Sequence, residues 1–143
     1  MMNNLAEWIC DMLGVLRDNP DALKLIHKCG GECCERDGTI YLMRKLRKES
    51  SEIDSLSELL SFLSGKLPAK FEKTEDGFIV HLGNPECLCK MRPALHRNAE
   101  TLCECTNGYQ LSMWSEFFGY EIETEILDTV LRGGNECNFK IKV

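Results

Sequence analysis

The sequence has no uninterrupted apolar run that approaches the roughly 20 residues needed to cross a bilayer. Its N-terminal stretch contains apolar side chains, but Glu7 and Asp11 interrupt them and no basic segment precedes them. Both observations argue against a secretory signal peptide and against a membrane span. We therefore expect a cytoplasmic protein, in a compartment where thiols stay reduced.

An excess of basic charge is also missing. Lys and Arg total 17 against 23 Asp and Glu, which gives a formal net charge of −6. Because nucleic acids are bound through clustered Lys and Arg, this balance argues against nucleic acid as a partner. The sequence also lacks internal repeats, low-complexity stretches and an obvious linker, and 143 residues suffice for one hydrophobic core. We expect a single domain over residues 1–143 that folds without disulfides.

Cysteine, by contrast, is abundant. There are nine cysteines, an odd number that fits poorly with a closed disulfide framework. Four of them form two Cys-x-Cys pairs, Cys87 with Cys89 and Cys103 with Cys105. In an extended strand, residues i and i+2 point to the same face, so each pair would present two thiols side by side. If the two segments are neighbours, four sulfurs converge into the donor set that zinc or iron prefers.

The remaining cysteines leave alternatives open. A variant site uses Cys29 and Cys33 with one residue from each later pair, and His27 could add a nitrogen ligand. Zinc is the expected cofactor, while an iron–sulfur cluster, redox chemistry without a metal, and burial of thiols as small apolar groups are the alternatives. Cys137 begins an alternating strand, and we expect it in the core.

The spacing of apolar residues changes from about 3.6 to 2 near residue 69. This change predicts an α+β domain, with N-terminal helices packed on an antiparallel sheet and one helix crossing before the last two strands. Asn19-Pro20-Asp21 is typical of a helix start, and Gly30-Gly31 of a helix end followed by a turn around Cys33-Cys34. The expected helices cover residues 5–17, 20–29, 39–48, 55–65 and 107–118, and the expected strands lie near 69–74, 78–82, 120–131 and 136–142.

The C-terminal order is a Cys-x-Cys segment, a helix, a Glu-rich strand and the sequence VLRGGNECNFKI, residues 130–141. This order resembles the 4-vinyl-reductase-type domain superfamily, which includes relatives of transport-particle subunits and of aminothiazoline-carboxylate hydrolases. The segments KCGGECC and CECTNGY are similar to a cysteine-rich bacterial branch of unknown function. The resemblance implies a ligand-binding α+β domain, often regulatory, that holds a small hydrophobic molecule or a metal between helices and sheet.

Three side chains are candidates for lining such a ligand pocket. Tyr109, Met113 and Trp114 follow the second Cys-x-Cys pair at helical spacing. The same stripe would pack equally well against a sheet, which is the expected role of Trp114. The expected function is a small binding or sensor module that couples a metal or redox state to ligand occupancy.

Two other function classes stay open. A thiol-dependent or aminothiazoline-carboxylate-type hydrolase needs an activated thiol, and Cys29 beside His27, or Cys33, is the arrangement that could supply one. No acid–base pair or phosphate loop supports that alternative. An assembly subunit or homodimer would use the last strand, Cys137–Val143, as an open sheet edge, although its lysines disfavour pairing.

Overall fold

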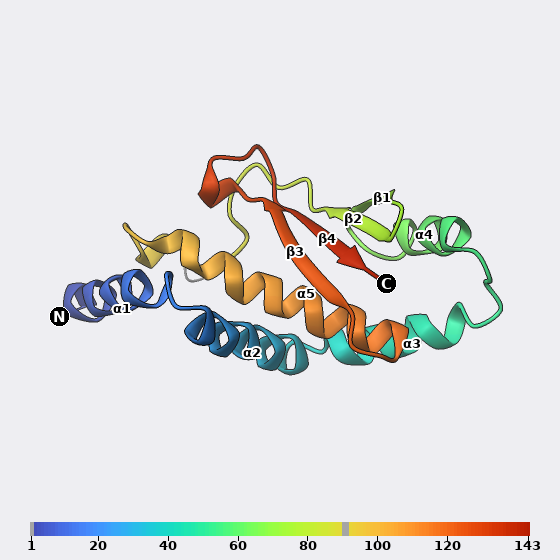
Figure 1. Cartoon of the computed structure of the whole chain (residues 1–143), viewed down its shortest axis with the longest axis horizontal. Helices are drawn as coiled ribbons and strands as arrows, with labels where there is room; N and C mark the ends of the chain where they lie inside the picture. Colours follow the sequence, from blue (N-terminus) through green and yellow to red (C-terminus); the bar gives the residue numbers. More distant parts are fainter. Residues whose placement is uncertain (1, 90–91) are drawn as a thin grey trace.

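The protein is described here by a computed structural model covering residues 2–89 and 92–143. Four helices precede the sheet, and a fifth helix lies between its two hairpins, which confirms the α+β class and the crossing helix (Figure 1). The helices are α1 (Met2–Leu16), α2 (Pro20–Arg36), α3 (Thr39–Glu49), α4 (Leu56–Ser64) and α5 (Cys103–Phe118), with short 3-10 turns η1 (Arg92–Ala94), η2 (Ala99–Leu102) and η3 (Val130–Arg132). The strands are β1 (Lys70–Lys73), β2 (Gly77–His81), β3 (Glu123–Asp128) and β4 (Asn138–Lys142).

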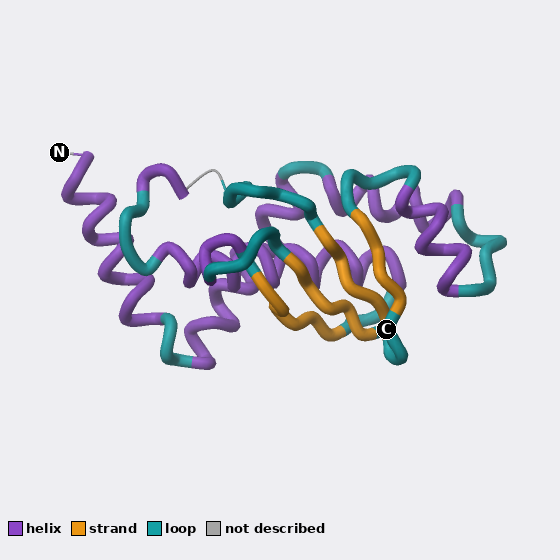
Figure 2. The backbone as a smooth tube through the Cα atoms, turned by 90° about the horizontal axis from the view of Figure 1, so that it is seen from above, coloured by secondary structure: helices purple, strands orange, loops and turns teal. Residues whose placement is uncertain are grey.

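The four strands form one antiparallel sheet in the order β1-β2-β4-β3. The last strand, β4, therefore pairs on both sides, and the expectation that it would be an open edge is wrong. The edges are instead β1 and β3 (Figure 2). Apolar and polar residues alternate along the last strand, as they do in many edge strands. The hairpin β1–β2 nevertheless pairs with its free side, and this contact between distant segments cannot be predicted from alternation.

The molecule is layered, with α5 between the sheet and the helices α2 and α3 (Figure 1). The inward residues of the two central strands pair across the sheet, Phe78 with Ile141 and Val80 with Phe139. All four are buried, and together with Trp114 on α5 they form the main core. The rings of Phe78 and Trp114 meet edge to face with their centroids 5.0 Å apart, a geometry that aromatic pairs favour.

Two glycines let α2 and α5 approach each other closely. A Cβ at Gly30 would collide with the carbonyl oxygen of Cys105, and a Cβ at Gly108 would collide with the backbone of His27. We expected Gly30 and Gly31 to end the helix after Cys29, but both glycines lie inside α2. The predicted turn around Cys33-Cys34 is also wrong, because those residues are in the same helix.

The fifth helix begins at Cys103, four residues before the predicted start at residue 107. The segment from Cys103 to Cys105 is therefore helical and not a strand. Successive helical residues are rotated by about 100°, so residues i and i+2 point about 200° apart. The expected side-by-side presentation of these two thiols is wrong for this reason.

His81, at the end of β2, lies between two carboxylates. Its Nε2 is 3.0 Å from Glu72 Oε2 and its Nδ1 is 3.1 Å from Glu136 Oε1. Burial acts to lower the pKa of the imidazole, but the hydrogen bonds to Glu72 and Glu136 outweigh burial and raise the pKa above its ordinary value. Protonated His81 is thus better stabilised in the folded protein than in the unfolded chain.

This arrangement predicts a pH dependence of stability. Because the folded pKa is the higher one, the stabilisation from His81 is complete below the unfolded pKa of about 6.5 and is lost as pH rises through the folded value. The free energy of unfolding should therefore fall between about pH 6 and pH 8 more steeply in the wild type than in His81→Gln. Urea denaturation of both proteins across this range measures the difference, and parallel curves would contradict it.

Candidate functional site

A small cavity lies where the loop after β2, the start of α5, η3 and the start of β4 meet. Its volume is about 40 Å³, enough for a water-sized or ion-sized guest and too small for an organic ligand. Four thiols line it, those of Cys87, Cys89, Cys103 and Cys137, and the remaining lining is mostly apolar. We refer to this space, with its four cysteines, as the thiol cavity.

Secondary structure and hydrogen bonds hold two of these cysteines in place. Cys103 is the first residue of α5 and is buried, and its Sγ donates to the Oγ1 of buried Thr129 over 3.2 Å. Cys137 directly precedes β4, and buried Asn84 contacts it twice. The Asn84 Oδ1 accepts from the Cys137 backbone N–H at 3.0 Å, and the Asn84 Nδ2 donates to the Cys137 Sγ at 3.2 Å.

The other two cysteines, Cys87 and Cys89, belong to the loop after β2, outside any strand or helix. Residues 85–89 are therefore not an extended strand, the geometry in which a Cys-x-Cys pair presents both thiols on one face, yet Cys87 and Cys89 both line one cavity. Asn84 anchors this loop as well, because its Nδ2 also donates to the carbonyl oxygen of Glu86 at 2.8 Å. One buried amide thus connects the loop to the fixed end of β4.

Burial favours the neutral form of two of the cavity thiols, those of Cys87 and Cys103. Burial raises the pKa of the Cys103 thiol, against the smaller opposing effects of the Thr129 hydrogen bond and of Arg132. Burial also raises the pKa of the Cys87 thiol, against the smaller opposing effect of a hydrogen bond from the Cys89 backbone. Neutral, desolvated thiols are weak nucleophiles, so burial does not activate Cys87 or Cys103 for thiol chemistry.

Cys105 lies on the other side of α5 and does not line the thiol cavity. It is half-buried, and its pKa is raised to about 11 by burial and then by the thiols of Cys89, Cys33 and Cys29. The structure thus brings three of the four predicted ligands to one cavity. The fourth thiol that lines the cavity is that of Cys137, which was predicted to lie in the core and is indeed half-buried against the main core.

In this conformation, no three His, Cys, Asp or Glu side chains among residues 2–89 and 92–143 are grouped closely enough to hold a metal ion. Cys29 and Cys33 are exposed on α2. His27, the predicted nitrogen ligand, has its Nε2 2.7 Å from Glu104 Oε2, so this ring nitrogen is engaged by a carboxylate and not by a thiol. The same carboxyl group of Glu104 also lies 3.6 Å from Arg132 Nη2 and so joins α2, α5 and η3.

The three predicted pocket residues lie elsewhere. Met113 and Trp114 are buried in the main core, where Trp114 Nε1 donates to Gln110 Oε1 at 2.9 Å. The Tyr109 hydroxyl lies between α2 and α3 and donates to Asp37 Oδ2 at 2.5 Å, beside Thr39 Oγ1 at 2.6 Å. None of the three lines the thiol cavity, and their role toward a hydrophobic ligand stays a prediction.

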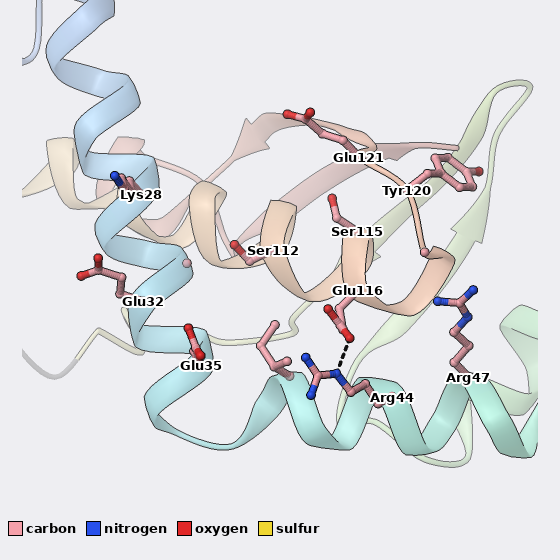
Figure 3. A pocket seen from close by; sticks show the side chains of 13 residues that line it. Lys28, Glu32, Glu35, Arg44, Arg47, Ser112, Ser115, Glu116, Tyr120 and Glu121 are labelled. Carbon is pink, nitrogen blue, oxygen red and sulfur yellow. Dashed lines mark hydrogen bonds and ion pairs between the residues drawn. The ribbon is translucent and has the colours of Figure 1, made fainter.

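A second hollow, not predicted from the sequence, is an open groove of about 730 Å³ between α2, α3 and the C-terminal half of α5 (Figure 3). Charged side chains of both signs line it, including Lys28, Glu32 and Arg47. Arg44 and Glu116 face each other across it, with Arg44 Nε 2.5 Å from Glu116 Oε1 (Figure 3). This polar lining is unsuited to the hydrophobic molecule that the resemblance implies.

A comparison with protein-family models matches the whole chain, residues 1–143, to a family described as "Family of unknown function (DUF6144)". The chain belongs to this family. No curated protein and no solved structure matches it, so the DUF6144 assignment carries no ligand or activity with it. The resemblance to the 4-vinyl-reductase-type superfamily stays an expectation. Among the described residues of this DUF6144 protein, no helix has both the length and the apolar character needed to cross a bilayer.

Proposed function

We propose that this DUF6144 protein is a small binding module for a thiophilic cation, with zinc as the expected ion and the thiol cavity as its site. The observation that carries the proposal is the convergence of four thiols on one small cavity from three separate segments of the chain. Sulfur is the donor that zinc and other soft cations prefer, and four sulfurs complete a structural zinc site.

The size and lining of the cavity favour an ion over other guests. A volume of about 40 Å³ excludes an organic cofactor, and an apolar lining gives a lone water few hydrogen-bond partners. A cation would displace protons from the thiols and turn an array of neutral groups into charged ligands. The positive charge of the ion would balance the negative charge of the resulting thiolates, in a site from which water is largely excluded.

Zinc binding requires the four sulfurs to draw together. A zinc–sulfur bond of about 2.3 Å in a tetrahedral site puts neighbouring sulfurs about 3.8 Å apart. Cys103 and Cys137 are fixed by α5 and by Asn84, whereas Cys87 and Cys89 belong to a loop without regular structure. The loop would therefore close on the ion, and occupancy of the site would be coupled to the position of the loop. This coupling is what a sensor module needs.

Metal content tests the proposal directly. Protein purified in the absence of oxygen should contain about one zinc per chain by elemental analysis, as a closed four-thiolate site would. The absorption spectrum separates an iron–sulfur cluster, which absorbs visible light, from zinc, which does not. Protein that takes up no soft cation, even when zinc is supplied to the reduced apo form, would overturn the proposal.

A further inference from the structure

The open groove between α2, α3 and α5 is lined by charged side chains, most of which have no partner of opposite charge within the protein (Figure 3). Of the charged groups that line it, only Arg44 and Glu116 form an ion pair among residues 2–89 and 92–143. The lining charges outside this pair are Lys28, Glu32, Glu35, Arg47 and Glu121. The groove therefore offers charges of both signs to a ligand.

The two signs are distributed unevenly between the walls of the groove. The α2 wall contributes two carboxylates, Glu32 and Glu35, against one ammonium group, Lys28. The α3 wall contributes two guanidinium groups, Arg44 and Arg47. A purely anionic ligand would be repelled by the α2 wall and a purely cationic one by the α3 wall. A zwitterion with its carboxylate toward α3 and its ammonium group toward α2 meets opposite charge at both ends.

The two arginines are held in place by contacts that leave their terminal donors unused. Arg44 Nε pairs with Glu116 Oε1 at 2.5 Å, and the Arg44 guanidinium lies over the Tyr41 ring, 5.5 Å from its centroid. Arg47 lies against Gly119, where an added Cβ would collide with the guanidinium. In the part of the chain that the structure describes, the Nη groups of both arginines make no hydrogen bond. Guanidinium groups ordered in this way bind a carboxylate at a low entropic cost.

Two hydroxyl groups line the groove on α5. They belong to Ser112 and Ser115, one helical turn apart (Figure 3). Ser115 Oγ accepts a hydrogen bond from the Ile122 backbone N–H at 3.2 Å, so its own proton is still available for donation. Hydroxyl groups both donate and accept, which suits the N–H and C=O groups of a peptide bond. The groove thus offers partners for a carboxylate, an ammonium group and the amides that connect them in a peptide.

We propose that this groove binds a short peptide through its two charged termini. Arg47, supported by Arg44, binds the terminal carboxylate, and Glu35 binds the terminal ammonium group. The serine hydroxyls on α5 bind the amides between them. A volume of about 730 Å³ lies within the range of about 300–1,000 Å³ that small-ligand sites occupy. The inference goes beyond the proposed function and does not depend on it, because the groove and the thiol cavity share no lining residue.

Triglycine is the probe for the test, because it carries both terminal charges and the amides but no side chain. An NMR titration of the isotopically labelled, reduced protein should shift the backbone signals of Ser112, Ser115 and Gly119. Triglycine amide lacks the carboxylate and N-acetyl-triglycine lacks the ammonium group. Each capped peptide should bind about tenfold more weakly than triglycine, because each loses a charge-assisted contact.

Variants assign the contacts to their residues. Arg47→Gln should weaken triglycine binding about tenfold but leave the affinity for triglycine amide unchanged, because that peptide has no carboxylate to lose. A merely structural role of Arg47 would weaken both peptides equally. Glu35→Gln is the reciprocal variant and should weaken triglycine but not N-acetyl-triglycine. Arg36→Gln makes the same charge change at an exposed residue outside the groove, and this control should bind triglycine as the wild type does.

Four results would overturn the inference. The wild type could fail to bind triglycine at millimolar concentrations, or it could bind triglycine and both capped peptides with equal affinity. Arg36→Gln could lose as much affinity as Arg47→Gln, which would make the effect one of net charge. Glycine could bind as tightly as triglycine, which would make the ligand a free amino acid and not a peptide. None of these results involves zinc content, so the thiol cavity is tested separately.

Discussion

Replacing Cys103 and Cys137 together by serine is expected to abolish the zinc-dependent stabilisation that the proposed function entails. Both thiols line the thiol cavity, and they are the two that the fold holds in place. A ligand that binds only the folded state stabilises it by RT ln(1 + [L]/Kd), which is about 2.7 kcal/mol when free zinc is at 100 times Kd. With two of the four proposed ligands removed, the increase in the free energy of unfolding on adding zinc should be close to zero. Urea denaturation with buffered zinc and with excess chelator measures it.

The design separates loss of metal from loss of packing. Serine is close to cysteine in size, and at position 103 its hydroxyl can still donate to Thr129. Any loss of stability from altered packing appears equally in the denaturation curves with excess chelator. Cys29→Ser/Cys33→Ser removes the same number of thiols from the protein surface and should keep the full zinc-dependent gain. A Cys103→Ser/Cys137→Ser protein that is stabilised by zinc as strongly as the wild type would show that the ion binds elsewhere.

Much of the fold could be predicted because its signals are local. The N-cap at Asn19 is confirmed by hydrogen bonds from the backbone N–H groups of Asp21 and Ala22 to its side chain. The alternation of the last strand correctly identified Phe139 and Ile141 as inward residues of one antiparallel sheet. Such features depend on a few neighbouring residues and on the period of apolar side chains, and both can be read directly from the sequence.

The errors arose where contacts between distant segments decide the structure. Gly30-Gly31 is a typical helix end in isolation, but here the small residues are needed inside α2 because α5 crosses at that point. The early start of α5 rotates Cys105 away from Cys103 and toward α2. Tertiary packing outweighed the local turn signal in the first case, and helical geometry replaced the assumed strand in the second.

The candidate site was predicted in part for the same reason. Density of cysteine pointed to Cys87, Cys89 and Cys103, which do share a cavity. Cys137 was missed as a site residue because an alternating pattern predicts which face a residue takes, not what the neighbouring loop presents to it. Its partner Asn84 belongs to a Gly-Asn-Pro turn 53 residues earlier, and nothing in either segment alone signals their contact.

Gly108→Ala is expected to lower the free energy of unfolding by about 2–3 kcal/mol, the upper part of the range for overpacked positions. Gly108 is buried inside α5, and the added Cβ would meet the backbone of His27 on α2. A backbone clash cannot be relieved by a change of rotamer, so the two helices must separate. Alanine's higher helix propensity, about 1 kcal/mol, offsets only part of the cost. Urea denaturation of the zinc-free protein measures the change.

Gly65→Ala is the matched control for this prediction. Gly65 caps α4 with an ordinary right-handed backbone, and a Cβ there would lie 3.5 Å from the Phe62 carbonyl oxygen, a normal contact. The substitution should change stability little, or increase it slightly, because alanine restricts the unfolded chain. If Gly108→Ala were as stable as Gly65→Ala, α2 and α5 could not be in the close contact described here.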